Sequence, residues 1–169
     1  MKKYAASFLL VLVGFLLQVS VLPAFTGTGI RPNIMIILVA SFGFMNGEKS
    51  GMAMGFACGL LTDIFFGSAI GLYTLLYVLA GYLNGLFQRV FYPEELKLPL
   101  MLILGSDVGL NFVCYCLLFL LRSRLNIVFY LFHVILPEAV FTFVIAVAVY
   151  PLLLFLHKKL EQAEKRSNE

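Results

Sequence analysis

Three acidic residues stand inside long apolar stretches of the chain, where charged side chains are rare. They are Asp63, Asp107 and Glu138. A charge at the centre of a bilayer is unfavourable by about 2.5–3.5 kcal/mol on insertion scales, so such residues usually face a bundle interior and pair or stay protonated. Their chemistry would be proton or ion handling, ligand binding, or hydrogen bonding to amides such as Asn33 and Asn111. We favour a buried polar network of these five residues.

Residue spacing does not indicate catalysis or metal binding. His133 lies five residues before Glu138, which would place the two side chains on different faces of a continuous helix. Cys114 and Cys116 are two residues apart and would point in nearly opposite directions, so they cannot share a metal. The segment GSDVGLN around Asp107 lacks the lysine of a nucleotide-binding loop. We therefore predict no catalytic residue, no metal and no cofactor.

Glycine recurs at every fourth position through one segment, and Asp63 is the single interruption. The series is Gly43, Gly47, Gly51, Gly55, Gly59, Asp63, Gly67 and Gly71. Residues four apart lie nearly above one another on a helix, so the central glycines form a narrow stripe without side chains. In an apolar segment, small residues at this spacing allow another helix to approach closely.

The stripe predicts a helix between two tight turns. The turns are expected at residues 47–50 and 67–71, and the helix would end at the carboxylate of Asp63. The predicted helix-packing interface consists of five glycines: Gly51, Gly55, Gly59, Gly81 and Gly85.

Composition indicates a membrane protein. The chain of 169 residues is 62% hydrophobic and only 12% charged, whereas about a quarter of the residues in a soluble domain are charged. The net charge of +3 comes from basic residues scattered among apolar segments, which does not indicate a nucleic-acid partner. Membrane lipid is the expected surrounding.

Six apolar stretches follow one another along the chain. They cover residues 4–22, 34–45, 52–66, 71–90, 98–121 and 127–156. The second is shorter than the roughly 20 residues of a membrane span, so we expect it to be tilted, supported by its neighbours, or re-entrant. A cleaved signal peptide is an alternative for the first stretch, but its length favours a retained helix.

These stretches predict an all-α polytopic bundle of about six transmembrane helices. Residues 1–157 would form one domain, and residues 158–169 a short polar cytoplasmic tail. If both termini are cytoplasmic, nine basic residues fall inside: Lys2, Lys3, Lys49, Arg89, Lys97, Lys158, Lys159, Lys165 and Arg166. Three fall outside: Arg31, Arg122 and Arg124. This bias agrees with the positive-inside rule and places the loops around Thr28 and Ser123 outside.

The order of several short motifs resembles the MreD family of bacterial rod-shape proteins. The motifs are Arg31-Pro32-Asn33, Gly47-Glu48-Lys49-x-Gly51, Gly59-Leu60-Leu61-x-Asp63, Gly67 through Gly71-Leu72, Gly81-Tyr82 and Leu136-Pro137-Glu138. Each motif alone is unspecific, but their order and spacing together are specific. The resemblance covers nearly the whole chain.

This resemblance implies a non-enzymatic, multi-pass component of the bacterial inner membrane. Proteins of the family act in cell elongation with MreC, which is expected to be the direct partner. The actin-like MreB and the transpeptidase and glycan polymerase of peptidoglycan synthesis are further expected partners. The implied function is a scaffold that helps to organise lateral peptidoglycan synthesis.

Two other functions remain open at this point. The family looks related in fold to the substrate-binding subunits of energy-coupling-factor vitamin transporters, which dock through an Ala-x-x-x-Ala pair on the first helix. Here Ala5 is followed by Leu9 and Ala6 by Leu10, so that pair is missing. A small proton-coupled transporter acting through Asp107 and Glu138 is the other alternative.

Overall fold

The computed structural model describes residues 2–21, 32–67, 71–90, 96–120 and 131–167. These residues form helices and no strand: α1 (Lys2–Leu16), η1 (Leu17–Val21), α3 (Ile34–Asn46), α4 (Glu48–Phe66), α5 (Leu72–Leu86), η2 (Phe87–Val90), α6 (Lys97–Leu120), η3 (Leu131–Ile135) and α8 (Leu136–Ser167). The predicted outer positions Thr28, Arg31, Arg122, Ser123 and Arg124 lie outside the described residues. The described part of the chain therefore shows the expected all-helical architecture.

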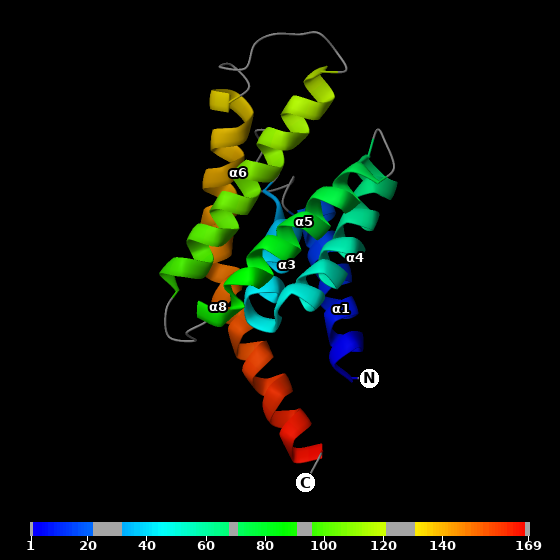
Figure 1. The fold of residues 1–169 in the computed structure, drawn as a ribbon, viewed down its shortest axis with the longest axis vertical. Coiled ribbons are helices and arrows are strands. Elements are labelled where there is room, and N and C mark those ends of the chain that lie inside the picture. The colour runs from blue at the N-terminus through cyan, green and yellow to red at the C-terminus, as the bar shows by residue number, and fades with distance from the viewer. Residues whose placement is uncertain (1, 22–31, 68–70, 91–95, 121–130, 168–169) are drawn as a thin grey trace.

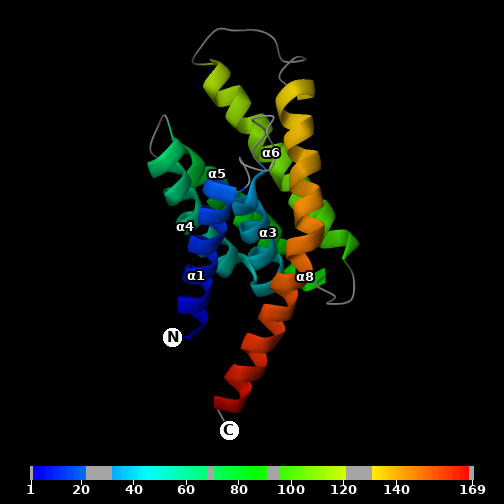
Figure 2. The ribbon, with the colours of Figure 1, turned by 180° about the vertical axis from the view of Figure 1, so that it is seen from behind.

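The short helix α3 lies at the centre of the bundle, as Figures 1 and 2 show. It has only 13 residues, and almost all of them are buried against α1, α4, α5, α6 and α8. A helix that is apolar on every face is stable only where other helices surround it. Its first turn is capped by Asn33, whose side chain accepts a hydrogen bond from the Ile36 N–H at 3.2 Å. The second apolar stretch is thus a buried helix supported by its neighbours.

Helices α4 and α5 touch backbone to backbone along most of their length. A Cβ added to Gly51 would lie closer than 3.0 Å to the Gly81 carbonyl oxygen, and one added to Gly55 would overlap the Tyr77 carbonyl. At the far end, a Cβ on Gly59 would overlap the backbone of Thr74. Any side chain at these glycines would therefore separate the two helices.

The same contact continues at the other end of the helix pair. Gly85 lies against the backbone of Glu48, and Gly43 of α3 is pressed against the carbonyl of Gly81. Three helices, α3, α4 and α5, thus meet around Gly81 without intervening side chains.

The turn before α4 is shorter than the sequence predicts. Helix α4 starts at Glu48 instead of Met52, and Gly47 alone reverses the chain with a φ of 89°. The Gly47 N–H donates to the Gly43 carbonyl, and the Gly51 N–H donates to the Gly47 carbonyl. The prediction of a turn over residues 47–50 was therefore wrong, because a single residue in this glycine-favouring conformation is sufficient to reverse the chain. Glu48 is also favourable in a first helical turn, where the helix dipole attracts negative charge.

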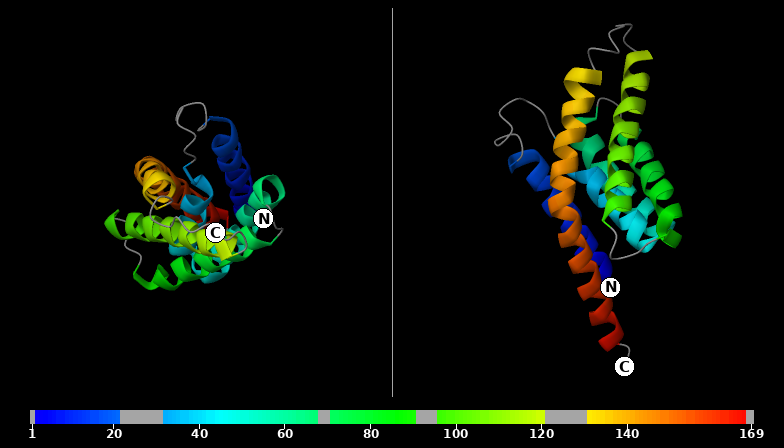
Figure 3. Two further views of the ribbon diagram at one scale, coloured as in Figure 1. Left: turned by 90° about the horizontal axis from the view of Figure 1, so that it is seen from above. Right: turned by 90° about the vertical axis from the view of Figure 1, so that its left-hand side faces the viewer.

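Helices α6 and α8 stand side by side and extend beyond the other helices at one end (Figures 1 and 3). The segments Lys97–Leu117 and Leu131–Lys159 are long and apolar enough to cross a membrane. Two other described helices, Leu9–Ser20 and Ile34–Asn46, are apolar but shorter. Helix α8 continues to Ser167, so most of the predicted polar tail is helical.

The beginning of α1 and the end of α8 lie at the same end of the bundle in the side views (Figures 1 and 2, and Figure 3, right). The ends of α1 and α4 and the starts of α3 and α5 lie toward the opposite end. This arrangement brings the first turns of α3 and α5 close to one another.

The backbone contact leads to a prediction about two glycines that differ only in surroundings. Gly59→Ala should lower the free energy of unfolding by about 1–3 kcal/mol, because the methyl group meets the backbone of Thr74. The matched control is Gly105→Ala, where a Cβ meets nothing within 4 Å. It should leave stability unchanged or raise it by up to about 1 kcal/mol through helix propensity. Unfolding in a titration with sodium dodecyl sulfate, followed by circular dichroism, measures both. Equal stability of Gly59→Ala and the parent would contradict the packing role.

Candidate functional site

Asp63 binds the start of the neighbouring helix α5. Its carboxylate accepts hydrogen bonds from the N–H groups of Gly71 at 3.0 Å, Tyr73 at 2.9 Å and Thr74 at 2.9 Å, and from the Thr74 hydroxyl at 2.5 Å. The first N–H groups of a helix have no partner within the helix and carry a partial positive charge. Asp63, near the end of α4, therefore caps the start of α5. These hydrogen bonds compensate for the burial of its side chain, since Asp63 is only 2% exposed.

Asn33 joins three helices in the interior of the bundle. Its side-chain oxygen accepts a hydrogen bond of 2.7 Å from the Tyr77 hydroxyl of α5, in addition to the bond from the Ile36 N–H. Its own N–H donates to the Thr142 hydroxyl of α8 at 3.1 Å. Asn33, Tyr77 and Thr142 are all buried. This cluster fixes the start of α3 relative to α5 and α8.

Asp107 of α6 lies near Glu138 of the neighbouring helix α8. Asn111, one turn after Asp107, donates to the Asp107 main-chain carbonyl at 3.1 Å and lies beside the Glu138 carboxyl. Thr142 lies close to Asp107. Asp107 is fully buried, and neither carboxyl oxygen has a hydrogen bond of normal geometry within the described part of the chain. The described residues thus offer the Asp107 carboxyl group one nearby hydroxyl, that of Thr142, which itself accepts from the Asn33 N–H.

The structure brings four of the five predicted polar residues together: Asn33, Asp107, Asn111 and Glu138. Asp63 is not hydrogen-bonded to them, since its described partners all belong to the start of α5. Sequence analysis missed Tyr77 and Thr142. Thr142 follows Glu138 by one helical turn, as Asn111 follows Asp107, and this parallel spacing was the available signal.

A cavity of about 410 Å³ lies beside this cluster. It is lined by Gln18, Val19, Asn33, Thr62, Phe66, Tyr73, Tyr77, Leu110, Asn111 and Glu138. Its volume falls within the range of about 300–1,000 Å³ that is usual for small-molecule sites. Amide, hydroxyl and carboxyl groups lie on its wall together with aromatic and aliphatic side chains, so the cavity is amphipathic.

A second cavity, of about 330 Å³, lies between α5 and α6. Its wall is mainly apolar and includes Gly105 and Gly109, which have no neighbour near the Cβ position. The Asn84 amide donates to the Ser106 hydroxyl at 2.7 Å and links the two helices there. The Asn84–Ser106 hydrogen bond thus joins α5 and α6, and the cavity separates the two helices next to this bond.

The described residues contain no organised site for metal binding or for thiol chemistry. No three of the His, Cys, Asp and Glu side chains there gather as metal ligands. Cys58 and Cys114 are buried and Cys116 is partly buried, all as free thiols. The polar groups that do gather are suited to hydrogen bonding and to binding of a polar ligand.

The Asp63 cap leads to a prediction that distinguishes it from the other buried acids. Asp63→Asn should lower the free energy of unfolding by about 1–3 kcal/mol, because the amide NH₂ must face at least one N–H donor of α5. Asp107→Asn is the matched control and should have little effect, since the amide oxygen can keep the contact with the Thr142 hydroxyl and no N–H donor of another helix faces this side chain among the described residues. The same detergent titration compares the two variants. A loss of stability that is equal in both would contradict a specific capping role.

Comparison with known protein families gives a match that covers most of the chain. Residues 2–160 match the family described as rod shape-determining protein MreD, which confirms the resemblance seen in the sequence motifs. No curated protein gave a match, and no solved structure did. The matched range includes every residue of the Asp63 cap, the Asn33 cluster and the cavity wall. The chain therefore belongs to the MreD family of rod shape-determining membrane proteins.

Proposed function

We propose that the protein is a non-enzymatic scaffold of the bacterial cell-elongation complex. It would help to organise lateral peptidoglycan synthesis through helix contacts with partner proteins. The observation that carries this proposal is the family match over residues 2–160. MreC is the proposed direct partner, and MreB, a penicillin-binding transpeptidase and a glycan polymerase complete the proposed complex.

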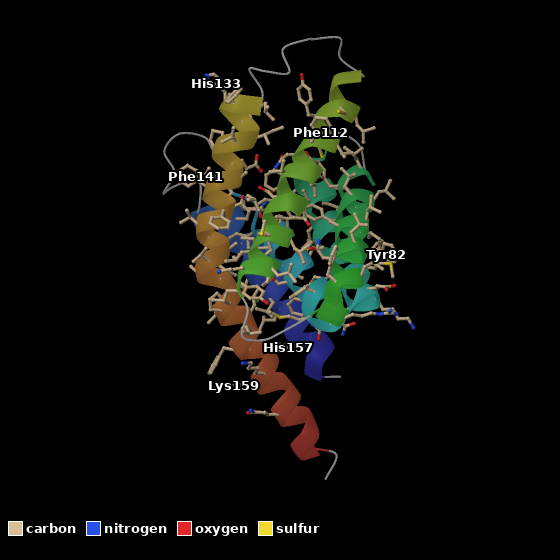
Figure 4. All side chains as sticks on the ribbon, turned by 60° about the vertical axis from the view of Figure 1, so that its left-hand side comes forward. Tyr82, Phe112, His133, Phe141, His157 and Lys159 are labelled. Atoms are coloured by element: carbon tan, nitrogen blue, oxygen red, sulfur yellow. The ribbon has the colours of Figure 1, made fainter. Side chains whose placement is uncertain are left out.

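The outer surface of the bundle presents apolar side chains to lipid or to other helices. Figure 4 shows Phe112 on α6 and Phe141 on α8 pointing away from the bundle; they are 51% and 39% exposed. Tyr82 of α5 is likewise exposed. Apolar surfaces of this kind contact lipid or the transmembrane helices of other proteins.

The transport alternatives receive no support from the family match. One of the three buried acids, Asp63, is also accounted for by its four hydrogen bonds to α5. This leaves a carrier with the two acids through which it was predicted to act, Asp107 and Glu138.

We also propose that the protein crosses the inner membrane several times with both termini in the cytoplasm. The start of α1 and the end of α8 lie at the same end of the bundle (Figure 2). Lys159 lies near that end (Figure 4). The predicted excess of basic residues on the cytoplasmic side, nine against three, agrees with cytoplasmic termini. Residues 1–157 would form the membrane domain, followed by the tail of residues 158–169.

Cysteine labelling tests this orientation. In a variant with Cys58, Cys114 and Cys116 replaced by alanine, Thr28→Cys should react with an impermeant maleimide added outside the inner membrane. Gln162→Cys should react only after the membrane is permeabilised, because charged tails with several lysines and arginines stay in the cytoplasm. Labelling of Gln162→Cys from outside would refute the proposed orientation.

Isolation of the native complex tests the scaffold role. The tagged protein, expressed at native level in a rod-shaped bacterium depleted of its own MreD, should restore rods and co-purify with MreC and a transpeptidase. The Gly105→Ala variant should do the same, whereas Gly59→Ala should recover less of both partners because its helix pair is separated. Mass spectrometry of gently solubilised complexes gives the readout. Recovery of an ATPase pair with a coupling subunit instead would overturn the scaffold proposal.

A further inference from the structure

The larger cavity has one carboxyl group on its wall and no basic side chain to pair with it. Glu138 is the one charged residue among the ten that line it, and none of the ten is basic. Asp107, a second acid, lies near Glu138 and is fully buried, with the Thr142 hydroxyl close to its carboxyl group. A carboxyl group in an apolar bundle must be neutralised by a proton or by a cation. A cation in the cavity can therefore take the place of the proton on Glu138.

The remaining wall indicates what kind of cation fits. Phe66, Tyr73 and Tyr77 place three aromatic side chains on the same cavity as the Glu138 carboxyl. Aromatic rings attract ammonium groups through their negative faces, and the attraction is strongest where water is excluded. Val19 and Leu110 add aliphatic surface for carbon atoms. This combination of one carboxyl, three aromatic rings and aliphatic surface matches an ammonium group that carries a carbon chain.

A bare metal ion fits the cavity less well. Hard cations such as Ca²⁺ require a compact cage of about six to eight oxygen ligands. Much of this wall is carbon, and a volume of about 410 Å³ leaves room for a molecule of many atoms.

We propose that this cavity binds an organic ammonium group, with Glu138 as its counter-ion and the amides of Asn111 and Gln18 beside it. The ammonium belongs either to a phospholipid headgroup or to a small free amine. The residues that line the cavity lie mainly near the ends of α1 and α4 and the starts of α3 and α5. This binding goes beyond the scaffold role and is tested on the purified full chain alone, so failure of one does not decide the other.

Free amines are tested first, on protein depleted of lipid in a neutral detergent. Choline and ethanolamine are the probes, and the control ligand is the uncharged isostere of choline in which carbon replaces nitrogen. Binding is measured by calorimetric titration. If the source is a free amine, at least one charged probe should bind the parent, and Glu138→Gln should weaken that binding about tenfold or more. The uncharged isostere should not bind measurably.

Lipid headgroups are tested in nanodiscs that contain phosphatidylethanolamine and phosphatidylglycerol in equal amounts. Native mass spectrometry should show the parent retaining phosphatidylethanolamine in preference, and Glu138→Gln should lose this preference. Retention of the lipid without binding of choline or ethanolamine assigns the headgroup as the source, and the converse result assigns a free amine.

A second variant keeps the test valid if Glu138→Gln does not fold. Val19→Trp fills the cavity from its partly exposed rim and leaves both carboxyl groups in place, so it should also abolish binding. The proposal is overturned if neither the free amines nor phosphatidylethanolamine binds the parent. It is equally overturned if the uncharged isostere binds as well as choline, or if binding survives both substitutions.

Discussion

The backbone contact between α4 and α5 is the constraint on which the rest of this structure depends. The glycines on both helices bring the two chains so close that carbonyl groups of α5 occupy the space of missing side chains on α4. At this separation the end of α4 lies beside the start of α5, and the Asp63 carboxylate reaches N–H groups of Gly71, Tyr73 and Thr74. The same helix pair provides Thr62, Phe66, Tyr73 and Tyr77 to the cavity wall. Wider separation would therefore disturb the cap and the cavity together.

Polar residues in the interior differ in how far hydrogen bonds account for them. Asp63 accepts four hydrogen bonds and the side-chain oxygen of Asn33 accepts two, which accounts for the presence of both residues in an apolar bundle. The Asp107 carboxyl oxygens have no hydrogen bond of normal geometry among the described residues, and Glu138 is partly exposed. Hydrogen bonding within the bundle therefore accounts for these two acids less fully than for Asp63.

Local sequence patterns predicted features that depend on one helix. The four-residue spacing of Gly51, Gly55 and Gly59 identified a surface without side chains, and the structure places these glycines against α5. The position of Asp63 at the end of the stripe was also visible, but its partners were not. They lie on another helix beyond a turn, and helical periodicity contains no information about which N–H groups a carboxylate will meet. The same limit applies to Tyr77 and Thr142, whose contacts with Asn33 join residues 44 and 109 positions apart.

The central position of α3 has a consequence for how the protein enters the membrane. A helix of 13 residues is about 20 Å long, whereas the hydrocarbon layer is about 30 Å thick. Helix α3 is synthesised before α4, α5, α6 and α8, yet these helices provide most of its surroundings. Because α3 is too short to span the membrane alone, it can reach its final position only after the later helices have left the ribosome. We expect α3 to stay beside the insertion machinery until the α4–α5 hairpin is released, so that insertion and tertiary packing occur as one event.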